Sequence, residues 1–241
     1  FSFFLPLGLT PLFDLDEGAF SEATREMLAS GNYLTTYLQG ELRFDKPILI
    51  YWLQALSAKL FGITTWAFRL PSALATTVWA YTLYRFCRSH LGQHKALTAL
   101  ILFVSCLHIN IIGKAAISDA LLNLWITLTL LNLYHFLTTG QDKNLLYAYA
   151  AAGLGVLTKG PIAILIPSAT ILLYASFTQS PRLLFSMLSA RGMVCFLAIA
   201  MPWYVCEYLD QGQGFIDGFI YKHNVGRFMS AMEQHHGSMW Y

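Results

Sequence analysis

The sequence predicts an all-α protein, a polytopic integral membrane bundle of helices, and three observations support this class. Of its 241 residues, 56% are apolar and only 12% are charged, whereas soluble proteins carry roughly a quarter charged residues. Several apolar stretches approach the about 20 residues that a helix needs to cross a hydrocarbon core about 30 Å thick. The net charge of +2 is small and the basic residues form no run, so we expect no nucleic-acid partner.

The predicted membrane helices follow one another with few polar interruptions. The first is the outer part of a helix that ends at Phe13, and the others cover 65–86, 95–113, 118–138, 145–158, 161–178 and 191–209. Because Gly and Pro end helices, the letters TKGP at 158–161 predict a tight re-entrant hairpin over 145–178. The run 47–61 is ambiguous, since at about 1.5 Å per residue it reaches only about 22 Å, and counting it as a span would invert the topology of everything after it.

The placement of charges decides the topology. If the run 47–61 lies on the membrane surface, three loops share one side. These loops are 85–95, 139–144 and 179–191. They hold six basic residues and one acid, Asp142, while the other twelve of the thirteen acids fall on the opposite side or at its helix ends. By the positive-inside rule the basic side is cytoplasmic, so the outer loops are 14–64 and 210–241, with amphipathic juxtamembrane helices on this outer side.

Five carboxylates follow the first apolar run: Asp14, Asp16, Glu17, Glu22 and Glu26. Asp16 can cap a helix that runs from about Glu17 to Ser30, with Gly31 as its stop. The charged face of a surface helix is normally solvated, which accounts for the acids at 22 and 26. The acids at 14 and 16 stand where the chain leaves the bilayer, where a carboxylate is costly unless it is paired or functional. A base at this boundary can act on a hydroxyl group while the other substrate remains in the membrane.

A second charged segment, ELRFDKP at 41–47, precedes the surface helix. Asp45 can cap this helix, and Tyr51 and Trp52 within it suit the headgroup region. Lys46 can hold a lipid phosphate at headgroup depth, although capping and snorkelling are sufficient explanations for either charged residue alone.

Three motifs, taken in order, resemble a known family. They are DLDEG through PSAL at 14–74, LTKGPIAILIP at 157–167 and HNVGRF at 223–228. Together they closely resemble the GT-C glycosyltransferases of the protein O-mannosyltransferase and lipid A aminoarabinose transferase superfamily. The resemblance covers nearly the whole chain and implies that 1–241 is the N-terminal transmembrane catalytic module, a fragment, since the family continues past Tyr241 with more membrane helices and often a soluble domain.

The resemblance also implies a chemistry and a set of residues. Members of the family are inner-membrane enzymes that transfer a sugar from a polyprenyl-phosphate donor to an acceptor on the periplasmic face. Lipid A, protein and another glycan all remain open as acceptors. The family's acidic residue matches Asp16, with Glu17 beside it, and its two basic residues match Lys46 and Arg227. Asp45 stands where many relatives have glutamate, and its arm is one methylene shorter.

We hypothesise that Asp16 accepts the proton of the acceptor hydroxyl while that oxygen attacks the anomeric carbon and displaces polyprenyl phosphate. A single attack from the face opposite the phosphate inverts the anomeric centre. Lys46 and Arg227 are the candidates for stabilising the departing phosphate. Lys114 and Lys159 also fall on the outer side, where they can attract a lipid phosphate or serve simply as turn lysines.

Two further assignments stay open at the level of sequence. Asp119 begins a helical run, where a helix cap and an active-site acid are equally compatible. A divalent metal ion is a candidate cofactor, with Asp45 and His223 as its ligands on the outer side. The adjacent His235 and His236 are weaker candidates, because neighbouring side chains do not converge on a helix.

Two other functional classes compete with the transferase. A lipid-linked sugar transporter or flippase also needs basic residues for phosphate, but it is expected to bury charges midway through its helices. Here nearly all charges lie at helix ends, which favours chemistry at the membrane surface. A non-catalytic assembly subunit is the third class, and such a subunit would tolerate the loss of Asp16.

Overall fold

The computed structural model describes residues 3–5, 7–12 and 16–225, and within them the chain is built mostly of helices. The elements in chain order are α1 (Asp16–Ser30), β1 (Tyr37–Leu38), β2 (Glu41–Leu42), α2 (Leu49–Phe61), α3 (Thr65–Leu91), α4 (Gln93–Ser105), α5 (Leu107–Lys114), α6 (Asp119–Thr139), α7 (Asp142–Lys159), α8 (Ile162–Phe177), α9 (Arg182–Ser186), α10 (Ala190–Gln211), α11 (Gln213–Phe215) and the π-helical η1 (Ile216–Val225). The two strands form an antiparallel hairpin in which Tyr37 lies opposite Leu42. The predicted all-α class is confirmed.

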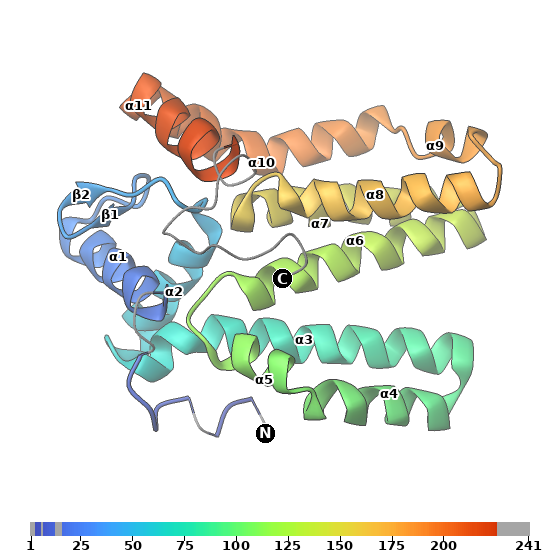
Figure 1. Ribbon diagram of the computed structural model, residues 1–241, viewed down its shortest axis with the longest axis horizontal. Helices are drawn as coiled ribbons and strands as arrows, with labels where there is room; N and C mark the ends of the chain where they lie inside the picture. Colours follow the sequence, from blue (N-terminus) through green and yellow to red (C-terminus); the bar gives the residue numbers. More distant parts are fainter. Residues whose placement is uncertain (1–2, 6, 13–15, 226–241) are drawn as a thin grey trace, which may run out of the picture.

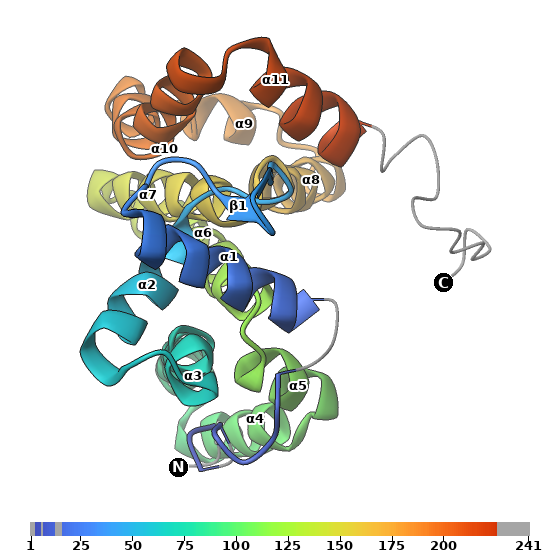
Figure 2. The same cartoon turned by 90° about the vertical axis from the view of Figure 1, so that its left-hand side faces the viewer.

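The long helices lie side by side, and the shorter elements gather at the two ends of this bundle (Figure 1). One end, which we call the α1–α2 end, carries α1, α2 and the β1–β2 hairpin. The opposite end, the α9 end, carries α9 and the connections from α3 to α4 and from α6 to α7. The three basic loops therefore share one end, as predicted. Viewed from the α1–α2 end, α1 lies across the ends of the long helices (Figure 2).

Two helices of the described chain, α6 and α10, are long and apolar enough to cross a membrane on their own. The pair α4 and α5 would make a third crossing, but its two helices are bent by 64°. The predicted span over 95–113 is therefore two helices rather than one. The break at Cys106 is stabilised by Asn110, whose Nδ2 donates to the carbonyl oxygens of Val104 at 2.6 Å and Cys106 at 3.0 Å. A side chain inserted into the backbone ladder is a common cause of such a bend.

The prediction of a helix that ends at Phe13 is wrong for the described residues 3–5 and 7–12. These residues form turns and coil. Phe3 and Leu7 are buried against α3 and α4. The guanidinium of Arg69 donates hydrogen bonds to the carbonyl oxygens of Leu7 at 2.8 Å and Pro11 at 2.8 Å. Carbonyls that bond a side chain in this way no longer need the helical ladder, so an apolar run can stay in turns.

A tight turn at TKGP joins α7 to α8 in a helical hairpin, as predicted, while its re-entrant placement in the membrane stays a prediction. Gly160 has a φ of 77° and donates its N–H to the carbonyl oxygen of Val156 at 2.9 Å, a conformation that favours glycine. The two helices also approach closely, because a Cβ atom at Gly155 would lie 2.8 Å from that of Ala163. The turn between α7 and α8 lies at the α1–α2 end (Figure 1), and Lys159 is the last residue of α7.

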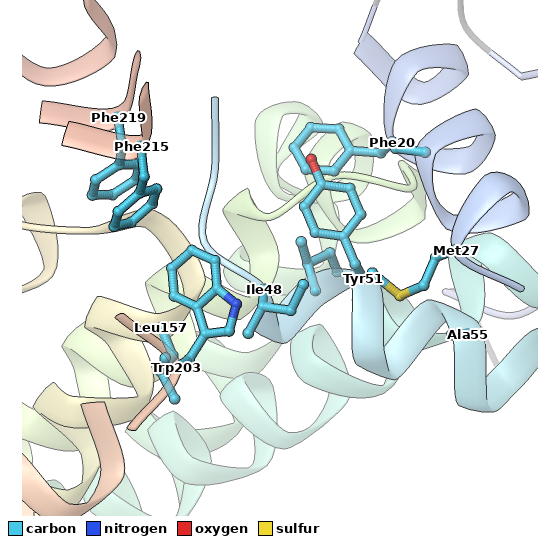
Figure 3. Packing of buried hydrophobic residues seen from close by; sticks show 11 residues of the cluster. Phe20, Met27, Ile48, Tyr51, Ala55, Leu157, Trp203, Phe215 and Phe219 are labelled. Atoms are coloured by element: carbon cyan, nitrogen blue, oxygen red, sulfur yellow. The ribbon is translucent and has the colours of Figure 1, made fainter. Parts of the chain in front are cut away.

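Buried apolar side chains tie the α1–α2 end to the long helices (Figure 3). The cluster includes Phe20, Met27, Ile48, Tyr51, Ala55, Leu157, Trp203, Phe215 and Phe219. The rings of Phe20 on α1 and Tyr51 on α2 stack with centroids 5.4 Å apart. Tyr51 is fully buried, so its predicted place among lipid headgroups is wrong. Trp52, one residue on, is exposed and donates its Nε1–H to the carbonyl oxygen of Tyr33 at 2.7 Å.

Candidate active site

Asp16 begins α1 at the α1–α2 end of the bundle. Carboxylates at 16 and 17 lie in the first turn of this helix, where the helix dipole favours negative charge. The helix ends at Gly31, which has a φ of 71° and donates its N–H to the carbonyl oxygen of Met27 at 3.0 Å. The predicted helix is confirmed, but Asp16 is its first residue rather than its cap. Asp16 is exposed, and the described residues give its carboxylate no hydrogen-bond or ion-pair partner.

Glu17 turns into the protein and meets Arg69 of α3. Its two carboxylate oxygens accept hydrogen bonds from Arg69 Nε at 2.8 Å and Nη2 at 2.7 Å. Both side chains are almost completely buried. Two parallel N–H···O bonds of this kind are stronger and more directional than a single contact.

The Glu17–Arg69 pair holds four separate segments together. Besides its two bonds to the carboxylate, the guanidinium donates to carbonyl oxygens of the N-terminal segment, including that of Thr10 at 2.9 Å. Glu17 also accepts the backbone N–H of Ala116, between α5 and α6, at 2.5 Å. These contacts favour a structural role for Glu17, so we retain the prediction of a catalytic carboxylate for Asp16 alone.

A cavity of about 460 Å³ opens beside Asp16, and we call it the Asp16 cavity. Its lining includes Thr10, the buried Glu17–Arg69 pair, and residues of α5 and of the segment that follows it. Asn110 and Lys114 supply polar atoms, and Ile111 and Ile117 supply apolar surface. A concave site with apolar walls and a few convergent polar groups suits an organic ligand.

The predicted phosphate ligand Lys46 belongs to a second charged group. Its Nζ donates to Asp45 Oδ1 at 2.7 Å, while Arg43 Nη2 donates to Asp45 Oδ2 at 3.1 Å. Two cations around one carboxylate leave a net positive charge, which can attract a phosphate. The helix that follows has Ile48 at its N-cap, without a side-chain cap bond, so the prediction that Asp45 caps α2 is wrong.

The buried side chain of Tyr51 contacts this second group through Arg43. Arg43 Nε donates to the Tyr51 hydroxyl oxygen at 3.3 Å. Burial raises the pKa of Tyr51 to about 12, against the opposing effect of the Arg43 charge. The phenol is therefore neutral at physiological pH and serves as a hydrogen-bonding group rather than as a base.

Asp119, the first residue of α6, and Lys159, the last residue of α7, form a third charged group. Lys159 Nζ donates to Asp119 Oδ1 at 2.5 Å. Asp119 lies in the first turn of α6 and Lys159 in the last turn of α7, so each charge also suits the dipole of its own helix. The pair is partly exposed, which leaves Lys159 accessible to a competing anion.

The metal prediction finds little support in these contacts. The Asp45 carboxylate is already held by two cations, and no three His, Cys, Asp or Glu side chains gather into a metal site within the part of the chain that the structure describes. The side chain of the other predicted ligand, His223, lies outside the described residues. The described donors do not fit a divalent ion, and we derive no chemical step through one.

The structure thus brings the predicted residues to one end of the bundle, in three groups rather than one. Arg227 lies outside the described residues. Arg69 was missed by sequence reasoning, although a charge inside the otherwise apolar start of α3 is a signal that it needs a buried partner.

Residues 45–205 match the family described as dolichyl-phosphate-mannose-protein mannosyltransferase. The chain belongs to this family. It is 30% identical over 246 aligned positions to the undecaprenyl phosphate-alpha-4-amino-4-deoxy-L-arabinose arabinosyl transferase of Aeromonas hydrophila, covering 100% of this chain and 45% of that protein. The protein of the same name from Aeromonas salmonicida is 31% identical, with 99% and 44% covered. The chain therefore spans less than half the length of these relatives.

The fold of this family member has counterparts among solved structures. The crystal structure of ArnT from Cupriavidus metallidurans bound to undecaprenyl phosphate superposes with a TM-score of 0.88 at 23% identity, covering 93% of this chain and 42% of that one. Its apo state gives a TM-score of 0.84 at 25% identity, with 92% and 42% covered. The predicted polytopic GT-C fold is confirmed by this likeness.

Proposed function

We propose that this family member is the N-terminal part, 1–241, of a membrane glycosyltransferase that moves 4-amino-4-deoxy-L-arabinose from undecaprenyl phosphate to lipid A. The names of the Aeromonas relatives support the donor. Lipid A is the acceptor we favour over protein and other glycans. The observation that carries the proposal is the exposed Asp16 carboxylate, which faces a cavity of about 460 Å³ at the α1–α2 end.

In the proposed reaction Asp16 acts as a general base. Its carboxylate accepts the proton of the acceptor O–H as the acceptor oxygen bonds to the anomeric carbon. The bond between that carbon and the phosphate oxygen breaks, and undecaprenyl phosphate leaves with the electron pair. Attack from the face opposite the phosphate inverts the anomeric centre. A positioned general base supplies about a hundred- to ten-thousand-fold in rate.

Stabilisation of the leaving phosphate is the second proposed contribution to the rate. Lys46 is the proposed ligand among the described residues, together with Arg227 further along the chain. Because Lys46 is bonded to Asp45, an incoming phosphate competes with that carboxylate for the ammonium group. Lys159 occupies a similar position with respect to Asp119. Charge-assisted bonds of this kind stabilise developing negative charge in a site that excludes water.

The proposed active site faces the periplasm. The basic loops gather at the α9 end, opposite the end that carries α1 (Figure 1), and the positive-inside rule puts such loops in the cytoplasm. A donor anchored in the membrane by its polyprenyl chain can then present its sugar at the boundary where Asp16 lies. Holding donor and acceptor together there supplies on the order of 7–11 kcal/mol in well-oriented cases.

The test uses the full-length protein in nanodiscs, supplied with undecaprenyl-phosphate-linked aminoarabinose and lipid A. We expect Asp16→Asn to lower transfer at least about a hundredfold, with its unfolding temperature and donor binding kept. Glu22→Gln is the matched control, because Glu22 is a solvent-facing carboxylate on the same helix that pairs with Arg25 at 2.7 Å. Equal activity of Asp16→Asn and wild type would remove Asp16 from the chemistry. Wild-type protein that, in closed vesicles, moves intact donor across the bilayer without releasing sugar would favour a flippase.

A further inference from the structure

Two charged side chains that line the Asp16 cavity, Asp16 and Lys114, form no ion pair within the described residues, whereas the charges of the neighbouring groups are paired directly. Glu17 and Arg69 neutralise each other in the wall. Lys114 is half-buried and has no hydrogen bond or ion pair within the described residues. An ammonium group beside apolar surface and without a counter-ion is costly unless water or an anionic ligand solvates it.

Packing explains how Lys114 reaches this position. The bend at Cys106 turns α5 away from the axis of α4, and α5 packs against α3. At Gly113 a Cβ atom would lie 2.7 Å from Thr76 Oγ1, so only glycine permits this close approach. The close contact fixes the register of α5, and Lys114 follows as its last residue. A cation also suits the C-terminus of a helix, but that preference does not require a cavity beside it.

Asn110, one helical turn before Lys114, also lines the cavity. Its Nδ2 is committed to the two backbone carbonyls at the bend. The amide oxygen has no donor within the described part of the chain and can accept a hydrogen bond from a ligand hydroxyl. The lining of the cavity thus includes a cation, a hydrogen-bond acceptor, the Asp16 carboxylate and two isoleucine side chains.

We propose that Lys114 is the residue that makes this enzyme selective for a phosphate-bearing glycolipid acceptor. The acceptor phosphate lies against the ammonium of Lys114, its sugar hydroxyls face Asn110, and its attacking oxygen points towards Asp16. The inference rests on the proposed function and deepens it. Without Lys114, Asp16 would repel an anionic acceptor from the same cavity, because like charges at close range disfavour binding.

The geometry assigns Lys114 to the acceptor rather than to the donor. The proposed donor-phosphate ligand Lys46 belongs to the Arg43–Asp45–Lys46 group, and none of these three residues lines the Asp16 cavity. Lys114 instead shares the cavity with the proposed base, which acts on the acceptor. As Asp16 takes up the acceptor proton its negative charge disappears, and Lys114 continues to neutralise the acceptor phosphate.

The experiment measures binding and transfer separately in full-length protein in nanodiscs. The probes are lipid A and the same glycolipid after removal of its phosphates. We expect wild-type protein to bind the phosphorylated probe at least about tenfold more tightly, equivalent to about 1.4 kcal/mol. Lys114→Met loses this preference and Lys114→Arg keeps most of it, while the KM for the donor is unchanged in both. Lys143→Met is the control, because Lys143 is an exposed lysine at the α9 end.

Two results would overturn the inference. One is an unchanged preference in Lys114→Met, and the other is an equal loss of affinity for both probes. Should Lys114→Met fail to fold, Lys114→Gln retains a polar side chain without the charge and serves in its place. Failure of the proposed function is recognised separately, as wild-type protein that releases no sugar from the donor. The binding comparison still decides the role of Lys114 in that case.

Discussion

Two ion pairs at the α1–α2 end differ in a way that separates support from function. Glu17–Arg69 and Asp119–Lys159 each join a carboxylate to a cation on a different element. The side chains of the first pair are 4% and 5% exposed, whereas those of the second are 33% and 27% exposed. Arg69 also donates to backbone carbonyl oxygens, from Nη1 to Leu7 and from Nη2, which Glu17 shares, to Pro11, while Lys159 has one described hydrogen bond.

Burial therefore decides which charges are available to a substrate. A buried pair has lost its water and cannot exchange a partner without leaving an uncompensated charge. A partly exposed pair can exchange its partner for water or phosphate at little cost. The Arg43–Asp45–Lys46 group lies between these two extremes, with exposures of 11% to 17%. Variants in the three groups should therefore show effects that decrease in the order of burial.

The largest effect is expected at the Glu17–Arg69 pair. Glu17→Ala leaves the guanidinium buried without its counter-charge, so we expect a loss of about 3–5 kcal/mol in the free energy of unfolding. Thermal unfolding in detergent measures this loss. The double variant Glu17→Gln with Arg69→Met should recover much of it, because the uncompensated charge is gone. A shift no larger than that of the exposed control Glu22→Gln would show that the pair does not hold the N-terminal segment.

An intermediate effect is expected at Tyr51, and it depends on pH. Burial raises the pKa of Tyr51 from 10.0 to about 12. Below pH 10 the phenol is neutral in both the folded and the unfolded chain, so its contribution to stability is constant. Between pH 10 and 12 the unfolded chain ionises first, and the free energy of unfolding falls. Two pKa units at about 1.36 kcal/mol each give a loss of about 2.7 kcal/mol.

Tyr51→Phe isolates this effect from the lysines that titrate in the same range. We expect the variant to lose one hydrogen bond from Arg43 at neutral pH, about 1 kcal/mol. Its stability should then decline less steeply than that of wild type above pH 10. Parallel declines of the two proteins would mean that the Tyr51 hydroxyl reaches water in solution.

The helical class and the sorting of charge between the two ends could be predicted from the sequence because both depend on local properties. Apolar length marks helices, and glycine at a positive φ marks the turns at Gly31 and Gly160. The prediction for the first apolar run was wrong because it too relied on local properties. Its composition suits a helix, but the hydrogen bonds that hold it come from Arg69, far along the chain.

The candidate site was only partly predictable, because its contacts join distant residues. Glu17 and Arg69 are 52 positions apart, and Asp119 and Lys159 are 40 apart. No local pattern states that these residues meet. The motifs identified charged residues of the right types, but only the packing of α1, α3, α6 and α7 shows which charges neutralise each other. Asp16 and Lys114 differ from the neighbouring charged residues because neither has an ion-pair partner among the described residues, and only the structure shows this.

The smallest effect on stability is expected at Asp119–Lys159. Lys159→Met and Asp119→Asn should each cost about 0.2–1 kcal/mol in the free energy of unfolding, because the pair is partly solvated. The two variants should instead shift the KM for the donor in opposite directions. Lys159→Met removes a cation and raises the KM for the undecaprenyl-phosphate donor. Asp119→Asn removes only the carboxylate that competes for this cation, so the KM falls.

Opposite shifts in KM distinguish a phosphate ligand from a structural contact. If the pair only joins α6 to α7, the two variants remove the same contact and should change the KM in the same direction, or not at all. Lys159→Arg adds a second comparison, because it keeps the charge and can bond both the carboxylate and a phosphate. A KM close to wild type in Lys159→Arg, together with opposite shifts in the other two variants, would place an exchangeable cation at the end of α7.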